Sequence, residues 1–132
     1  MPYINIRLGK KLDNEQRKQL YADTTSLMNT VMKKQPKVTV VNIQESDPRQ
    51  WSVNANQLTA KEPTGAYVDI KVTDQTNTPE EKAEMISKTV KMLQDVVGII
   101  QEACYVVIDD ISADSWGYNG KTQAARATST KA

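Results

Sequence analysis

Few side chains in this sequence can exchange a proton near neutral pH. The chain contains no histidine and a single cysteine, Cys104. The absence of histidine excludes Ser-His-Asp and Cys-His nucleophiles, zinc or iron sites with imidazole ligands, and imidazole acid–base catalysis. One cysteine can form neither an internal disulfide nor a thiolate metal cage, so a reducing compartment fits the sequence. We therefore expect no metal ion and no cofactor.

Paired carboxylates and scattered basic residues are the remaining groups that could act on a substrate. Asp109 and Asp110 are adjacent at the end of an apolar run. Neighbouring residues of a strand point to opposite faces, so we do not expect joint acid–base catalysis by this pair. Arg7, Lys10–Lys11 and Lys71 are candidates for binding an anionic substrate, although each can also be a solvated surface residue.

Charge and hydropathy limit the partners of the protein. The 132 residues contain 17 Lys and Arg against 16 Asp and Glu, a net charge of +1, and the two signs are interspersed. This pattern lacks the basic patch that binding to nucleic acids or anionic membranes requires. The apolar runs are short, and the N-terminus has no basic segment followed by an apolar one. We expect a soluble cytoplasmic protein that binds neither nucleic acid nor membranes.

The first part of the chain predicts a strand, a helix and a second strand. Residues 2–8 alternate between the two faces of a strand. Asp13 and Gln16 have the spacing of a capping box, which predicts the start of a long amphipathic helix. The helical pattern stops at Gln35-Pro36, since proline disfavours further helix. Residues 38–43 are rich in β-branched side chains, which predicts a second strand.

The same order of elements begins again after the turn-forming residues 62–65. Residues 66–72 alternate as a strand does. Thr78-Pro79 is typical of a helix start, with an N-cap followed by proline at the first helical position. Gly98 supplies a helix stop, and residues 104–108 predict another strand. The chain therefore contains a β-α-β pattern twice.

The two halves align at a fixed separation, which indicates an internal repeat. Pro2 aligns with Ala66 at an offset of 64, and beyond one extra residue before the second helix the offset is 65, as for Trp51 and Trp116. One such unit cannot bury both faces of its strands, so the halves should share one sheet. We predict an α+β fold with one four-stranded mixed sheet and two helices on one face. Within each unit the strands should be parallel and the crossover right-handed.

These boundaries define the expected domain. We expect residues 1–132 to form a single domain of two units, about 2–60 and 66–125, with a tail at 126–132. The helix-free face of the sheet would then carry partly apolar side chains, including Tyr3, Tyr67 and Tyr105. Such a face is expected to be buried against other subunits.

Two segments carry a resemblance to a known family. Met1-Pro2 leads directly into an alternating strand, and residues 114–120 are rich in turn-forming and aromatic residues. A β-α-β unit that begins with proline after the initiator methionine, and that occurs twice, resembles the tautomerase superfamily. Residues 114–120 are similar to the aromatic-glycine hairpin that closes the family's pocket. The layout resembles that of malonate semialdehyde decarboxylase and implies a tautomerase/MIF-like fold assembled as a homotrimer.

The resemblance implies a role for the amine of Pro2. In the family, the freed amino-terminal proline acts on small carboxylate or enol substrates. Terminal amines have a pKa of about 7.7 to 8.0, and burial or nearby cations lower it toward neutrality. While Met1 is attached, the Pro2 nitrogen is an amide and cannot act as a base. We therefore expect a keto-enol tautomerase for a small enol or α-keto acid, active in a form that starts at Pro2.

The sequence departs from the family pattern where arginines bind the substrate. In the two-unit decarboxylases the paired arginines before the second helix fall at Gln75 and Asn77 of this chain. A lysine can supply positive charge but does not reproduce a bidentate arginine grip. The expected substrate-binding residues are Lys10, Lys11, Arg7, Trp116 and Lys71. A non-catalytic binding or scaffold protein with the same fold, or a family decarboxylase or hydratase, stays open as an alternative.

Overall fold

The computed structural model describes residues 1–131. The first unit consists of β1 (Tyr3–Leu8), α1 (Asn14–Thr30), a 3₁₀ helix (Pro36–Val38) and β2 (Val40–Glu45). The second consists of β5 (Ala66–Thr73), α2 (Pro79–Val97) and β6 (Tyr105–Ile111). After the first unit come a 3₁₀ helix (Pro48–Gln50) and the hairpin β3 (Ser52–Val53) and β4 (Asn56–Gln57). After the second come the hairpin β7 (Gly117–Tyr118) and β8 (Lys121–Thr122), and then α3 (Gln123–Lys131).

The four long strands form one mixed sheet in the order β2-β1-β5-β6. Within each unit the two strands are parallel, and the units join through the antiparallel pair β1 and β5. Tyr3 lies opposite Lys71, and Leu8 lies opposite Ala66. The start of β1 therefore adjoins the end of β5, and the start of β5 adjoins the end of β1. The predicted fold class is confirmed.

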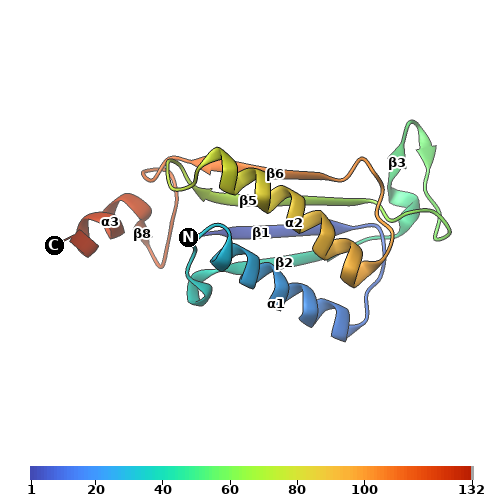
Figure 1. Cartoon of the computed structure of the whole chain (residues 1–132), viewed down its shortest axis with the longest axis horizontal. Helices are drawn as coiled ribbons and strands as arrows, with labels where there is room; N and C mark the ends of the chain where they lie inside the picture. Colours follow the sequence, from blue (N-terminus) through green and yellow to red (C-terminus); the bar gives the residue numbers. More distant parts are fainter. Residues whose placement is uncertain (132) are drawn as a thin grey trace.

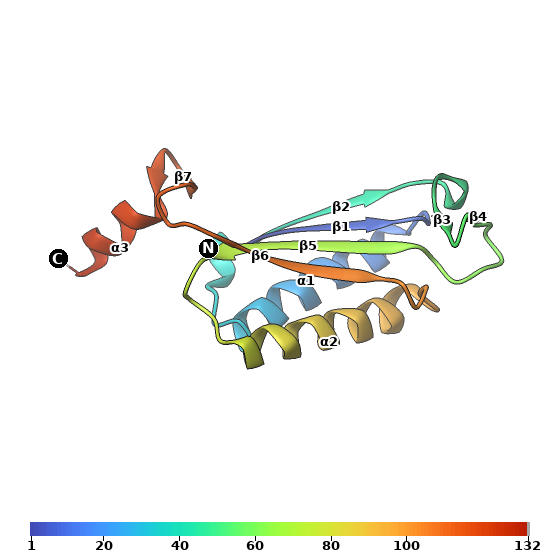
Figure 2. The same ribbon diagram turned by 90° about the horizontal axis from the view of Figure 1, so that it is seen from above.

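Helices α1 and α2 lie side by side on one face of this sheet, and no helix of residues 1–131 covers the other face (Figures 1 and 2). The core lies between the helices and the sheet, because alternate residues of β1 and β5 point toward α1 and α2. Its fully buried side chains include Ile4, Ile6, Leu20, Met28, Ile70, Met85 and Leu93. Within residues 1–131, no helix combines the length and apolarity that crossing a membrane would need.

The second unit repeats the local contacts of the first. The predicted capping box at Asp13 is formed before α1, and the predicted N-cap Thr78 forms a capping box with Glu81 before α2. Trp51 accepts a backbone hydrogen bond from the N–H of Leu58 at 2.9 Å. Its counterpart Trp116 accepts one from the N–H of Gln123, also at 2.9 Å. The β3–β4 and β7–β8 hairpins are therefore equivalent, although the sequence predicted only the second.

Two segments differ from the expectations. Helix α1 ends at Thr30 and not at Gln35-Pro36, because Lys33 adopts a left-handed conformation (φ 61°) that closes the helix. The segment expected as a tail from residue 126 forms most of α3, whose alanines favour helix. The hydroxyl of Thr122 accepts a hydrogen bond from the N–H of Ala125 and so caps its first turn.

Candidate active site

Pro2 is buried at the start of β1, directly after the half-exposed Met1. Its carbonyl accepts a hydrogen bond from the N–H of Val40 at 3.3 Å, which fixes the chain end against the beginning of β2. Burial lowers the pKa of the terminal amine, and the positive charge of Lys34 lowers this pKa further. An amine at this end of the sheet is therefore less protonated at neutral pH than an ordinary chain terminus.

Lys34 is a buried cation beside the chain end, with 7% of its surface exposed. The turn after α1 positions it, since its N–H donates to the carbonyl of Met28 at 3.0 Å. Its Nζ donates to Oγ1 of Thr76 at 2.7 Å. Burial lowers the pKa of Lys34, while the negative charges of Glu81 and Asp110 act in the opposite direction. The ammonium has three donor hydrogens, of which Thr76 uses one.

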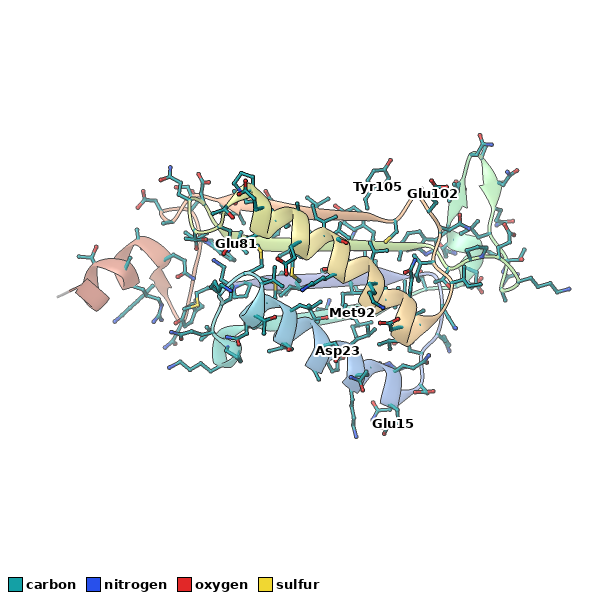
Figure 3. The ribbon with its side chains drawn as sticks, in the orientation of Figure 1. Glu15, Asp23, Glu81, Met92, Glu102 and Tyr105 are labelled. Carbon is teal, nitrogen blue, oxygen red and sulfur yellow. The ribbon has the colours of Figure 1, made fainter. Side chains whose placement is uncertain are left out.

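Asn77 and Gln75 occupy the positions at which the family resemblance places arginines. The amide nitrogen of Asn77 donates to the carbonyl of Met32 at 2.8 Å and to Oε1 of Glu81 at 3.1 Å. Asn77 therefore ties the first turn of α2 to the end of α1. Gln75 is exposed in a left-handed turn (φ 64°). Figure 3 shows Glu81 near the start of α2, at the end of the sheet where the N-terminus lies.

Trp116 lies at the same end of the sheet as Pro2. Its Nε1 donates to Oγ1 of Thr73 at 3.2 Å, which holds the half-buried indole against the end of β5. The segment with β7, β8 and α3 extends beyond this end of the sheet (Figure 1). Trp51, the counterpart of Trp116, lies at the opposite end, where its Nε1 donates to Oγ of Ser46 at 2.8 Å.

Lys71 also lies near the chain end, on the helix-free face opposite Tyr3. Its Nζ lies 3.0 Å from Oδ2 of Asp109 and 3.6 Å from Oδ2 of Asp69. The hydrogen bond that Lys71 donates to Asp109 is the main reason that the pKa of Lys71 is raised. Its charge is therefore largely matched by carboxylates of the same sheet face.

Asp109 and Asp110 lie on opposite faces of β6. Asp109 faces Lys71, whereas Asp110 accepts a hydrogen bond from Nζ of Lys82 in α2 at 2.6 Å. The two carboxylates therefore belong to different layers of the molecule and cannot act on one substrate atom. This confirms the geometry expected for adjacent strand residues.

Three of the expected binding residues lie away from Pro2 within one chain. Arg7 is exposed on the helix-free face, where its Nε donates to Asn5 and Gln44 at 3.1 Å each. Lys10 and Lys11 follow β1 and line a cavity of about 670 Å³ at its far end. A strand of this length separates its ends by about 20 Å. The structure thus places Pro2, Lys34, Lys71 and Trp116 at one end of the sheet, and Lys10 and Lys11 at the other.

Lys34 is the site residue that sequence reasoning missed. It stands in the polar run Lys33-Lys34-Gln35 after an amphipathic helix, where solvated lysines are common. The repeat contained one signal: the counterpart of Lys34 at offset 65 is the apolar Ile99. In the alignment of the two units, this pairing of a charged residue with an apolar one, near the end of the sheet where Pro2 was expected, could have marked Lys34 as unusual.

The arrangement supports proton transfer on a small anion. A terminal amine with a lowered pKa can act as a base near neutral pH. A buried ammonium beside it can stabilise negative charge that develops on an oxygen of the substrate. Neither group requires a metal ion.

Comparison with known proteins places both units in one family. The family model described as Tautomerase (tautomerase enzyme) matches residues 2–61 and again residues 67–126. Probable tautomerase K2 of Dickeya dadantii (strain 3937) is 37% identical over 62 residues, which are 46% of this chain and 92% of that protein. This relative therefore matches about one unit.

Solved structures share the complete fold at low sequence identity. Pt0534 inactivated by 2-oxo-3-pentynoate superposes with a TM-score of 0.82 at 17% identity, covering 94% of this chain and 98% of that chain. The R7 fused 4-OT wild type asymmetric trimer has a TM-score of 0.82 at 15% identity, covering 95% of this chain and 98% of that chain. Both likenesses extend over the two β-α-β units and the sheet that joins them.

Proposed function

Because this chain belongs to the tautomerase family, we propose that it is a keto-enol tautomerase whose freed Pro2 amine is the general base. The observation that carries the proposal is the pairing of a buried chain end with the buried cation of Lys34. Removal of Met1 converts the Pro2 nitrogen from an amide into a secondary amine. The same surroundings that lower the pKa of the terminal amine at Met1 then act on Pro2.

The proposed reaction moves one proton within the substrate. The Pro2 amine accepts the proton of an enol hydroxyl, and the resulting ammonium returns a proton to the adjacent carbon as the carbonyl forms. Negative charge builds on the substrate oxygen between these steps. Lys34 stabilises that charge, since a donor in a buried site interacts more strongly than one in water. Trp116 forms a wall of the same site.

The proposed substrate is a small enol or α-keto acid. The site offers lysine in place of arginine, so it selects a compact anion and does not grip a carboxylate at two points. Asn77 is held by Met32 and Glu81, which leaves the decarboxylase arginine position without a cation. This arrangement favours tautomerisation over decarboxylation or hydration.

We propose a homotrimer as the active assembly. R7 fused 4-OT, which shares this fold, is a trimer. The helix-free sheet face carries exposed apolar side chains, including Val40 at 55% and Tyr105 at 69% exposure. Three chains with these faces around a common axis would bury them.

The test of the function combines intact mass spectrometry with a measurement of turnover. Intact mass spectrometry of the natural protein should show a species lighter by one methionine. Ketonisation of phenylenolpyruvate by this species should be saturable and should disappear in Pro2→Ala. Binding of keto acids without turnover would instead support a non-catalytic binding protein, and unchanged turnover in Pro2→Ala would remove the proline from the mechanism.

A further inference from the structure

A cavity lies at the end of the sheet opposite Pro2. The cavity of about 670 Å³ there is lined by Gly9, Lys10, Gly65, Gly98 and the connecting segment 58–64, among others. Gly65 is the repeat counterpart of Met1 at offset 64, and Gly98 is the counterpart of Lys33 at offset 65. The cavity therefore occupies the position in the second unit that the Pro2 site occupies in the first.

Contacts around the two positions correspond. At the Pro2 end, the amide nitrogen of Asn77 donates to the carbonyl of Met32 at 2.8 Å. At the cavity, Nζ of Lys10 donates to the carbonyl of Val97, the counterpart of Met32, at 3.0 Å. In both units a side chain from the turn after the first strand thus binds the end of the opposite unit's helix.

Two ion pairs, one at each end of the sheet, also correspond. Arg17 contacts Glu45 at 2.6 Å beside the cavity. Lys82 contacts Asp110, also at 2.6 Å, at the Pro2 end, and both members lie at offset 65 from the first pair. The two ends of the sheet are therefore built alike.

The chemistry at the two ends differs in one respect. The counterpart of Pro2 is Ala66, which lies within the chain, so its nitrogen is a peptide amide and never a base. Trp51 covers this chain segment closely, because a Cβ on Gly65 would lie 2.8 Å from its indole. A ligand in the cavity therefore finds no proton acceptor at the position of the catalytic amine.

Charge at the cavity favours an anion. Its lining contains Lys10, Lys11 and Lys61, and three carboxylates. Each carboxylate already accepts hydrogen bonds: Glu45 from Arg17 and Leu12, Asp47 from Arg49, and Glu62 from Thr59. Two of these carboxylates are matched by arginines from outside the lining, Glu45 by Arg17 and Asp47 by Arg49. Three lysines of the lining therefore stand against one carboxylate, Glu62, that has no ion-pair partner among the described residues.

The cations are also available to a ligand. Within the described part of the chain, the ammonium groups of Lys11 and Lys61 form no hydrogen bond or ion pair, and Lys10 uses one of its three donors. Apolar side chains complete the lining, among them Pro48, Leu58, Pro63 and Val97. A carboxylate with a small apolar body matches both features.

We propose that this cavity binds a small apolar carboxylate without converting it, as a non-catalytic counterpart of the Pro2 site. Lys10 and Lys11 hold the carboxylate, and the walls formed by segment 58–64 enclose its apolar part. The assignment rests on the repeat, the cavity and the lysines, and it is independent of whether Pro2 is a base.

Nuclear magnetic resonance with phenylacetate as the probe tests the proposal on the full chain. The amide signals of Gly9, Gly65 and Gly98 should shift saturably in the wild-type protein and equally in Pro2→Ala. In the double variant K10Q/K11Q the dissociation constant should rise about tenfold or more, because charge-assisted hydrogen bonds are lost. The variant K18Q is the matched control, since Lys18 lies on the exposed face of α1 beside Glu15, and it should bind as the wild type does.

Three other outcomes of these measurements would each contradict part of the account. Shifts confined to the Pro2 end, with none at Gly65 and Gly98, would overturn the proposal. Equal affinity of the wild type and K10Q/K11Q would overturn the role of the lysines. Saturable shifts at Gly65 in a protein whose Pro2→Ala variant keeps its turnover would support the second site while contradicting the proposed function.

Discussion

Lys34 donates from Nζ to Oγ1 of Thr76 at 2.7 Å, and this contact joins the end of α1 to the turn before α2. It holds a buried positive charge at the end of the sheet where the chain begins. The two residues belong to different units, so the Pro2 end of the first unit is completed by the second. A single β-α-β unit of this chain would lack this contact.

The first prediction concerns the charge of Lys34. Burial lowers the pKa of the terminal amine, and Lys34 lowers it further. In Lys34→Met the repulsion is lost, so the pKa of the Pro2 amine rises and less of it is unprotonated. The acid limb of the kcat/KM profile should move to higher pH. At pH values below that pKa, kcat/KM should fall, because a smaller fraction of the amine is unprotonated.

The neighbouring Lys33 provides the control for this experiment. It is exposed, and its Nζ donates to the carbonyl of Thr30. Lys33→Gln should leave the acid limb close to its wild-type position. An unchanged acid limb in Lys34→Met would show that this cation does not tune the amine.

The second prediction concerns the pH dependence of stability at Glu45. The hydrogen bond from Arg17 is the main reason that its pKa lies below the ordinary value of 4.5. Because the folded-state pKa is depressed, its stabilisation is present above the unfolded-state pKa and is lost as pH falls through the folded-state pKa. In urea titrations, Glu45→Gln should be less stable than the wild type at pH 6, and the difference should shrink as pH falls below 4.5 and through the lower folded-state pKa. A difference that persists at low pH would assign the effect to packing.

The third prediction compares two equivalent buried hydroxyls. Oγ1 of Thr24 donates to Sδ of Met92 at 3.4 Å, whereas Oγ1 of its counterpart Thr89 is buried without a partner among the described residues. An unsatisfied buried hydroxyl costs about 1–3 kcal/mol. Thr89→Val should therefore raise the free energy of unfolding by about 1 kcal/mol.

Thr24→Val is the matched control and should give no such gain, because it removes a paired hydroxyl. Both variants are compared with the wild type by chemical denaturation at one protein concentration. Equal effects at the two positions would mean that Thr89 has a partner in solution.

The fourth prediction concerns assembly through the helix-free face. Tyr105 is 69% exposed and Val107 is 37% exposed on the edge strand β6, where Figure 3 shows Tyr105 projecting from the ribbon. The double variant Y105E/V107E should shift the sedimenting species from a trimer toward the 14.8 kDa chain. The exposed variant Y21E, at α1 on the other face, should leave the trimer intact. A wild-type protein that sediments as a monomer would contradict the assembly.

Much of the fold could be predicted from sequence because its signals are local and occur twice. The capping boxes at Asp13 and Thr78 lie within single helical turns, and the offset of 64 and 65 joins the units. The β3–β4 hairpin was missed because Asn54 and Ala55 supply its left-handed turn without glycine. The pair Asn54-Ala55 is a weaker turn signal than Asn119-Gly120, which forms the turn of the second hairpin.

The site was less accessible to sequence reasoning because its contacts are non-local. The hydrogen-bond acceptor of Lys34 is Thr76, which lies 42 positions away along the chain. The placement of Lys10 and Lys11 follows from the length of β1, which separates the turn after the strand from Pro2. Their positive charge alone suggested Lys10 and Lys11 as substrate-binding residues, and the strand geometry places them at the end of the sheet opposite Pro2.

The most direct test of the account compares the same chain with and without Met1. Protein produced while the host's methionine aminopeptidase is inhibited retains Met1, and treatment with that enzyme exposes Pro2. Intact mass spectrometry verifies each form before its rate with phenylenolpyruvate is measured. We predict saturable ketonisation by the form that starts at Pro2 and none above background by the form that retains Met1. Equal rates of the two forms would contradict a mechanism based on the amine of Pro2.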